Sequence, residues 1–253
     1  MLPREHGAYG QLLFPILTAL AVGRPTAAAM LLASAAVLTF LAHEPLLVLL
    51  GQRGPRAARA DRSRAIGWFV ATGGAAVVFG VASMLIAPSS VRAAVAVPGA
   101  LTVVLAAVIV SGREHSAVGE LVAAATFASL AYPVARAGGA ASHASLTCAL
   151  AFAAMFIAST VCVRAVIQHT RRPPAWPARV GGVAVAFGAL CVLWSMAEAG
   201  RLSSIAAVGA LPACLAAALV ALFAPGSRRL RLIGWTLVTT TMLGAVALIA
   251  ALG

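Results

Sequence analysis

The sequence predicts an all-α polytopic membrane protein with about nine transmembrane helices. Hydrophobic residues make up 62% of the 253 residues, charged residues make up 9%, and the mean hydropathy is +1.01. Average soluble domains contain about 45–50% apolar and about 25% charged residues, so this chain has too little polar surface for a water-soluble fold. Soluble enzymes, nucleic-acid-binding proteins and disordered chains are therefore excluded as classes.

Cutting the chain at proline, glycine and charge clusters leaves nine apolar segments of about the length that crosses a bilayer. The first segment has a basic start, as signal peptides do, but no small-x-small cleavage site precedes Gly23-Arg24-Pro25. We expect this segment to be retained in one transmembrane domain, residues 1–253. The nine predicted helices span residues 8–23, 25–50, 66–87, 91–111, 117–135, 144–169, 180–197, 204–223 and 231–251.

The basic residues predict the orientation of these helices. All eighteen are arginine, and with the N-terminus inside, fourteen of them fall on the cytoplasmic side and four on the other. The positive-inside rule therefore predicts a cytoplasmic N-terminus and an external C-terminus in the bacterial inner membrane. The net charge is +12, and we expect most of the arginines to set the topology and to contact anionic lipid headgroups. Nucleic acid is therefore not expected as a partner.

The cysteines, four in number, all lie within apolar stretches and show no metal-ligand spacing. We expect them to be buried and reduced. They are Cys148, Cys162, Cys191 and Cys214.

Acidic residues and histidines are rare, and most of them gather at the predicted cytoplasmic helix ends. The triplet Arg-Glu-His occurs twice, as Arg4-Glu5-His6 before the first helix and as Arg113-Glu114-His115 before the fifth. This repetition predicts two four-helix halves plus a ninth helix, with a site between the halves. The alternative is a coincidence of charges at the membrane interface.

His43-Glu44 interrupts an apolar segment, because Leu46 to Leu50 continue it. Ionisable groups at such depth are costly and are candidates for function. On a regular helix the two side chains point about 100° apart, so a site must draw on several helices. The alternative is that each charged set is a solvated helix end, and that Arg164 extends to the lipid headgroups.

We predict roles for these residues from their chemistry. His43 and Glu44 would act as acid and base, and Arg4, Arg113 and Arg164 would bind an anionic substrate. Imidazoles and carboxylates also bind divalent metal ions, although no strong metal motif is present. The candidate metal ligands are His6, His43, Glu44, His115 and Glu120.

Two segments resemble the YwiC-like family of bacterial integral membrane proteins. One is Pro3-Arg4-Glu5-His6-Gly7-Ala8-Tyr9, and the other is His43-Glu44-Pro45-Leu46, which leads through Gly51-Gln52-Arg53-Gly54 to an arginine-rich loop. The resemblance covers the whole chain and implies an uncharacterised membrane protein, without a mechanism.

The architecture also distantly resembles the UbiA superfamily of intramembrane prenyltransferases. That family has Asp-rich motifs at the cytoplasmic ends of helices 2 and 6, where magnesium holds a prenyl diphosphate. Here the second helix ends in His43-Glu44-Pro45, and the segment Arg164 to Arg172 carries no carboxylate. No UbiA residue can therefore be carried over.

The leading functional hypothesis is an intramembrane enzyme acting on an isoprenoid or other lipid-like anionic substrate, with membrane lipids as its other partners. The alternatives are a transporter for a small solute or ion, and a membrane subunit without chemistry. Polar groups at the cytoplasmic rim would favour the enzyme, whereas a polar path through the middle of the bundle would favour transport.

Overall fold

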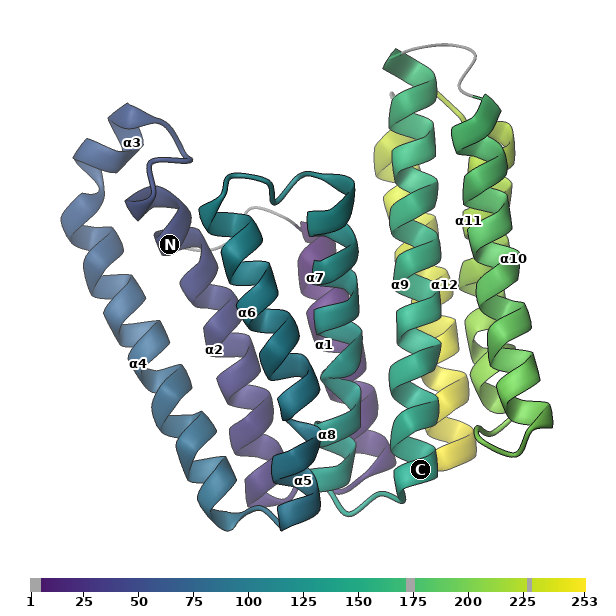
Figure 1. Ribbon diagram of the computed structural model, residues 1–253, viewed down its shortest axis with the longest axis horizontal. Helices are drawn as coiled ribbons and strands as arrows, with labels where there is room; N and C mark the ends of the chain where they lie inside the picture. Colours follow the sequence, from purple (N-terminus) through teal and green to yellow (C-terminus); the bar gives the residue numbers. More distant parts are fainter. Residues whose placement is uncertain (1–5, 172–175, 227–228) are drawn as a thin grey trace.

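The structure is a computed structural model that describes residues 6–171, 176–226 and 229–253. Every regular element in these ranges is a helix (Figure 1). The helices are α1 (His6–Val22), α2 (Ala27–Leu49), α3 (Pro55–Ala60), α4 (Arg62–Ile86), α5 (Ser89–Ala94), α6 (Ala96–Val110), α7 (Ala117–Ser129), α8 (Ala131–Ala137), α9 (Ser142–Arg171), α10 (Trp176–Glu198), α11 (Ile205–Phe223) and α12 (Leu230–Leu252).

These helices confirm the prediction of about nine membrane spans. Within the described ranges, eight segments are long and apolar enough to cross a membrane, and the apolar part of α1, Gly7–Val22, is shorter. Two of the spans each consist of two consecutive helices, α5 followed by α6 and α7 followed by α8. The short helix α3 links α2 to α4 and was not predicted.

Proline explains both divided spans. Pro98 lies in the first turn of α6 and Pro133 in the first turn of α8. Proline lacks the backbone N–H that a helix interior needs, but the first turn leaves that group unbonded. In each of these two spans, one helix therefore ends and the next begins just before the proline.

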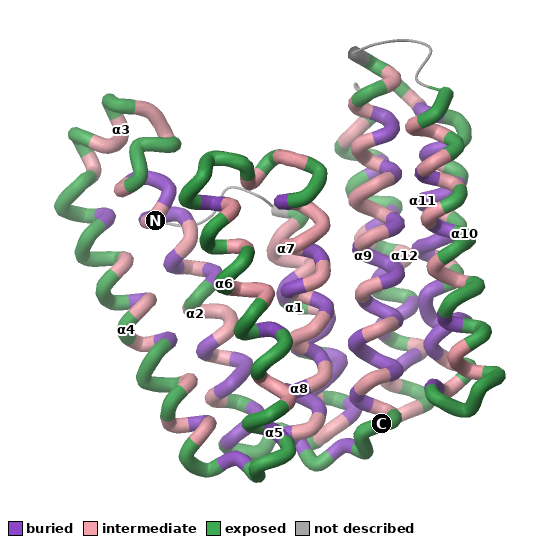
Figure 2. The backbone as a smooth tube through the Cα atoms, viewed as in Figure 1, coloured by how far each residue is buried: buried purple, intermediate pink, exposed green. Residues whose placement is uncertain are grey.

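The core is centred on α9, which packs against α7, α8, α10 and α11. Phe152 and Met155 on α9 are fully buried among small side chains from the neighbouring helices. Close packing depends on glycine at one crossing, because a Cβ on Gly244 of α12 would meet the backbone oxygen of Gly209 on α11. In Figure 2, α9 is largely buried, whereas α4 and α10 are mostly exposed.

The exposed surface is apolar, as expected for helices in contact with lipid. Leu85 on α4 is 79% exposed and Phe223 on α11 is 72% exposed. Of the four free cysteines, three are buried, but Cys191 is exposed. The prediction that all four are buried is therefore wrong for Cys191, because α10 covers the outside of the bundle and turns much of its surface outward.

The rare ionisable residues separate to the two ends of the bundle. We call the end where α2 and α6 end and α7 begins the upper end, as it lies in Figure 1. His43, Glu114 and Glu120 lie there, whereas His143 at the start of α9 and Glu198 at the end of α10 lie at the opposite end. The predicted separation of these residues is confirmed, and the predicted internal repeat stays a prediction.

Candidate functional site

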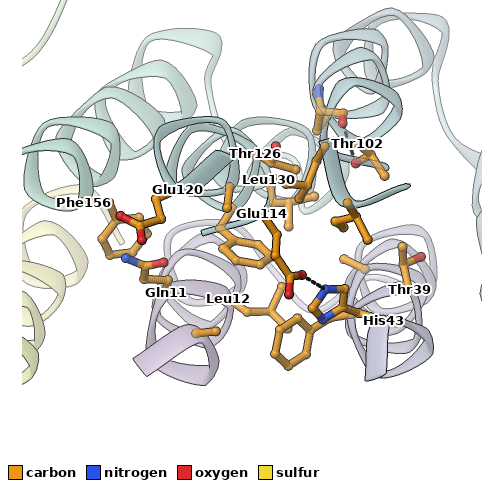
Figure 3. Close-up of a pocket in the computed structure, with 18 of the residues that line it drawn as sticks. Gln11, Leu12, Thr39, His43, Thr102, Glu114, Glu120, Thr126, Leu130 and Phe156 are labelled. Carbon is orange, nitrogen blue, oxygen red and sulfur yellow. Dashed lines mark hydrogen bonds and ion pairs between the residues drawn. The ribbon is translucent and has the colours of Figure 1, made fainter. Parts of the chain in front are cut away.

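A carboxylate lies between two imidazoles at the upper end. Glu114, in the loop between α6 and α7, has one oxygen, Oε2, 3.1 Å from Nε2 of His43 on α2 (Figure 3). Its other oxygen, Oε1, lies 3.3 Å from Nε2 of His115. The side chains of His43 and Glu114 are 20% and 14% exposed, whereas that of His115 is 70% exposed. One imidazole is therefore sheltered, the other faces outward, and the carboxylate connects them.

Local contacts fix the loop that carries Glu114. Ser116 caps α7, because its hydroxyl oxygen accepts a hydrogen bond of 3.1 Å from the backbone N–H of Gly119. The loop then folds back over the first turn of α7. A Cβ on Gly119 would lie 2.5 Å from the carbonyl oxygen of Glu114 and 2.6 Å from that of Arg113. Only glycine leaves room for this backbone.

Replacing Gly119 with alanine should therefore displace the loop and destabilise the protein by roughly 1–3 kcal/mol, as overpacking does elsewhere. Thermal unfolding in detergent would measure the loss. Gly67→Ala is the matched control, because nothing lies within 4 Å of its added Cβ. Equal stability of the two variants would contradict this account of the loop.

Glu44 forms a second ion pair, with a partner different from that of His43. Its two carboxylate oxygens accept hydrogen bonds from Nε of Arg53 at 3.0 Å and from Nη2 of Arg53 at 2.6 Å. The side chain of Glu44 is 8% exposed. Gln52, next to Arg53, donates a 2.6 Å hydrogen bond to the carbonyl oxygen of Ile109, which joins the end of α2 to the end of α6.

A third ion pair connects α7 to α9. Arg164 on α9 donates a hydrogen bond of 2.7 Å from Nη1 to Oε2 of Glu120 on α7. The same nitrogen lies 3.3 Å from the backbone oxygen of His115. Arg164 is thus held by the loop and the helix that position Glu114.

One member or more of each of these ion pairs borders a cavity of about 990 Å³ in the bundle. Its deeper walls are mostly apolar, with Leu12, Phe127 and Leu130 among the lining residues. Side chains from α1, α2, α4, α6, α7, α9 and α12 line it. Its lining residues that carry charge or an imidazole lie at the upper end and are His43, Arg53, Glu114, His115 and Glu120.

The structure brings several of the predicted residues together. His43, His115, Glu120 and Arg164 belong to one connected set of contacts, and Glu44 lies beside it, paired with Arg53. Arg113 is exposed at the loop. The remaining predictions, for Arg4, Glu5 and the side chain of His6, lie outside the described residues.

The metal prediction for His6, His43, Glu44, His115 and Glu120 stays a prediction. Across the described ranges, no group of three or more His, Cys, Asp or Glu side chains is placed to hold a metal ion. In this structure the carboxylates of Glu44 and Glu120 each face an arginine instead.

Sequence reasoning assigned no role to Glu114 or Arg53, which the structure places at the centre of two pairs. The Arg-Glu-His triplet did contain Glu114, but its neighbours received the roles of substrate and metal ligand. Arg53 was counted among the residues that set orientation. Its distance of nine residues from Glu44 was the available signal, because a chain that turns back at the end of a helix brings such residues together.

The chain was compared with known families, curated proteins and solved structures. The family model described as YwiC-like protein matches residues 2–135, about half of the chain, whereas the resemblance was expected over all of it. No curated protein and no solved structure matches the chain. The matched region contains every ionisable residue of the site except Arg164.

Proposed function

Since the chain belongs to the YwiC-like family, we propose that the site in the matched region makes it an intramembrane enzyme. The substrate we propose is an isoprenoid or another lipid-like molecule with an anionic head. The head would bind at the upper end, and the tail would occupy the cavity.

The division of the cavity into apolar walls and a charged end carries this proposal. Ligand sites are typically concave and mostly apolar, with a few polar groups that fix the orientation of the ligand. About 990 Å³ would hold on the order of thirty water-sized groups, at about 30 Å³ each, which is room for a long hydrocarbon tail. The ionisable lining groups lie at one end of the bundle, and this favours reaction at a head group over transport across the bundle.

His43 and Glu114 would act as the acid–base pair. A hydrogen bond from one ring nitrogen to a carboxylate fixes the tautomer and orientation of an imidazole, so the other nitrogen can accept a proton. With Nε2 of His43 donating to Glu114, the free nitrogen is Nδ1. His115, on the far side of the carboxylate, would exchange protons with water.

Arg53 and Arg164 would stabilise an anionic head. Each guanidinium is oriented by a carboxylate, Arg53 by Glu44 and Arg164 by Glu120. Donors fixed in advance stabilise developing charge without reorganisation during the reaction. Arg113, exposed on the loop, would attract the head from outside.

A binding experiment with radiolabelled farnesyl diphosphate would test the proposal on purified protein in detergent. We expect saturable binding that exceeds the binding of farnesol, the uncharged comparison ligand, by at least tenfold. Equal binding of the two would show that the head is not recognised. Absence of saturable binding for both would contradict the lipid substrate.

The orientation we propose places the upper end in the cytoplasm. The fourteen arginines assigned to the cytoplasmic side include Arg53, Arg113 and Arg164. A C-terminal alkaline phosphatase fusion should be active in bacterial cells, and a fluorescent-protein fusion at the same position should be dark. The reverse result would place the site on the external face.

A further inference from the structure

Three hydroxyl groups in the cavity do not bond to their own helices. In helices, Ser and Thr commonly donate a hydrogen bond to a carbonyl one turn earlier. Two threonines on one side of the cavity do so, Thr39 to Ala35 at 2.8 Å and Thr102 to Pro98 at 2.7 Å. Within the described chain, the hydroxyls of Ser159, Thr160 and Thr241 line the cavity without a hydrogen bond.

These hydroxyls lie on a distinct side of the cavity. Ser159 and Thr160 belong to α9, and Thr241 belongs to α12. In Figure 3, Gln11, Glu120 and Phe156 lie toward one side and His43, Thr39 and Thr102 toward the other, with Leu12, Glu114, Thr126 and Leu130 between them. We call the part lined by Gln11, Phe156, Ser159, Thr160 and Thr241 the α9 chamber.

The α9 chamber lies between two contacts made by α9. Ser159 and Thr160 lie five and four residues before Arg164, about 6–8 Å along the helix axis. The Arg164–Glu120 ion pair therefore lies on the upper side of the chamber. Below it α12 meets α9, because a Cβ on Gly244 would lie 2.9 Å from Sδ of Met155.

Leaving these groups without partners has an energetic cost. The hydroxyl oxygen of Ser159 is buried without a hydrogen bond, and a buried polar group without a partner costs about 1–3 kcal/mol. A ligand that supplies hydrogen bonds would recover this cost. Three hydroxyls and the amide of Gln11 can both donate and accept, and they carry no charge.

We propose that the α9 chamber is a second ligand site, which takes an uncharged molecule bearing hydroxyl or carbonyl oxygens. The residues that define the chamber are all uncharged, so the chamber itself offers no charge to an ion. The α9 chamber belongs to the same cavity as the His43–Glu114 pair, but the second site rests on the unpartnered hydroxyls rather than on the lipid proposed above. An enzyme with both sites would bind two substrates.

Photolabelling of the full chain with 3-azioctanol, an uncharged alcohol with a photoreactive group, would test this site. Mass spectrometry of the peptides should show saturable labelling around residues 156–163 of α9 and residues 237–241 of α12. The variant Ser159→Ala/Thr160→Val/Thr241→Val should reduce this labelling at least fivefold. Thr102→Val is the matched control, and it should leave the labelling unchanged because that hydroxyl already bonds within α6.

Two outcomes would overturn the second site. One is labelling spread over the lipid-facing helix surfaces, and the other is equal saturable labelling of the wild type and the triple variant. Circular dichroism would verify that the triple variant is folded. If it is not, the single variant Thr160→Val replaces it, with an expected twofold loss. Farnesyl diphosphate binding is measured in parallel, so a failure of the lipid proposal is distinguishable from a failure of this one.

Discussion

Glu44→Gln is expected to destabilise the protein by about 3 kcal/mol, the low end of the range for breaking a buried ion pair. The substitution removes the carboxylate charge that faces the half-buried guanidinium of Arg53. The carboxylate is 8% exposed and accepts two hydrogen bonds from Arg53, so the geometry of the pair is favourable. The low end applies because the side chain of Arg53 is 28% exposed and partly solvated.

Reversible unfolding in mixed micelles would measure this loss. Arg56→Gln is the control, because Arg56 is exposed on the short helix α3 and should change the stability by less than about 0.5 kcal/mol. A stable Glu44→Gln variant that lacks activity would instead support the acid–base role that the sequence predicts for Glu44.

Glu114→Gln should lower the rate of the proposed reaction by about 10²–10⁴-fold, the usual contribution of general acid–base catalysis. The amide keeps the shape of the side chain but removes the carboxylate charge that orients His43. The lipid to be measured is identified first, as the one whose cellular amount changes when the wild-type protein is overproduced. We expect the overproduced Glu114→Gln variant to leave that lipid unchanged.

Glu198→Gln is the matched control, because Glu198 is exposed at the opposite end of the bundle. It should retain the full rate. If Glu114→Gln also retains it, then the His43–Glu114–His115 contacts are structural, and the proposed enzyme loses its acid–base pair.

The helices could be predicted well from the sequence, and their breaks less well. Apolar length, with cuts at proline, glycine and charge clusters, locates the eight long apolar helices of the described ranges and the shorter α1, because each helix must satisfy its backbone within the bilayer. Pro98 and Pro133 lie where their spans divide, but many membrane helices continue through proline, as α2 does at Pro45. Whether a proline divides a span depends on packing, which the sequence does not show.

The gathering of the site residues could be predicted, but their pairing could not. Position along each helix determines which end of the bundle a residue reaches, and this is why His43 and Glu114 were expected together. The different partners of His43 and Glu44 agree with the expected 100° between neighbours on a helix. His43 pairs with Glu114 because the turn before α7 places that carboxylate beside it. The cavity depends on how closely the helices pack. Neither is encoded in a short motif.

The length of α9 makes the structure sensitive to bilayer thickness. Its 30 residues span about 45 Å, whereas a typical hydrocarbon core is about 30 Å thick. Arg164 lies 22 residues after Ser142, about 33 Å along the helix, close to where that core would end. A thicker bilayer would enclose the Arg164–Glu120 pair in acyl chains and strengthen it, whereas a thinner one would expose it to water. Lipid acyl length would thereby regulate how firmly α7 and α9 are held together above the cavity.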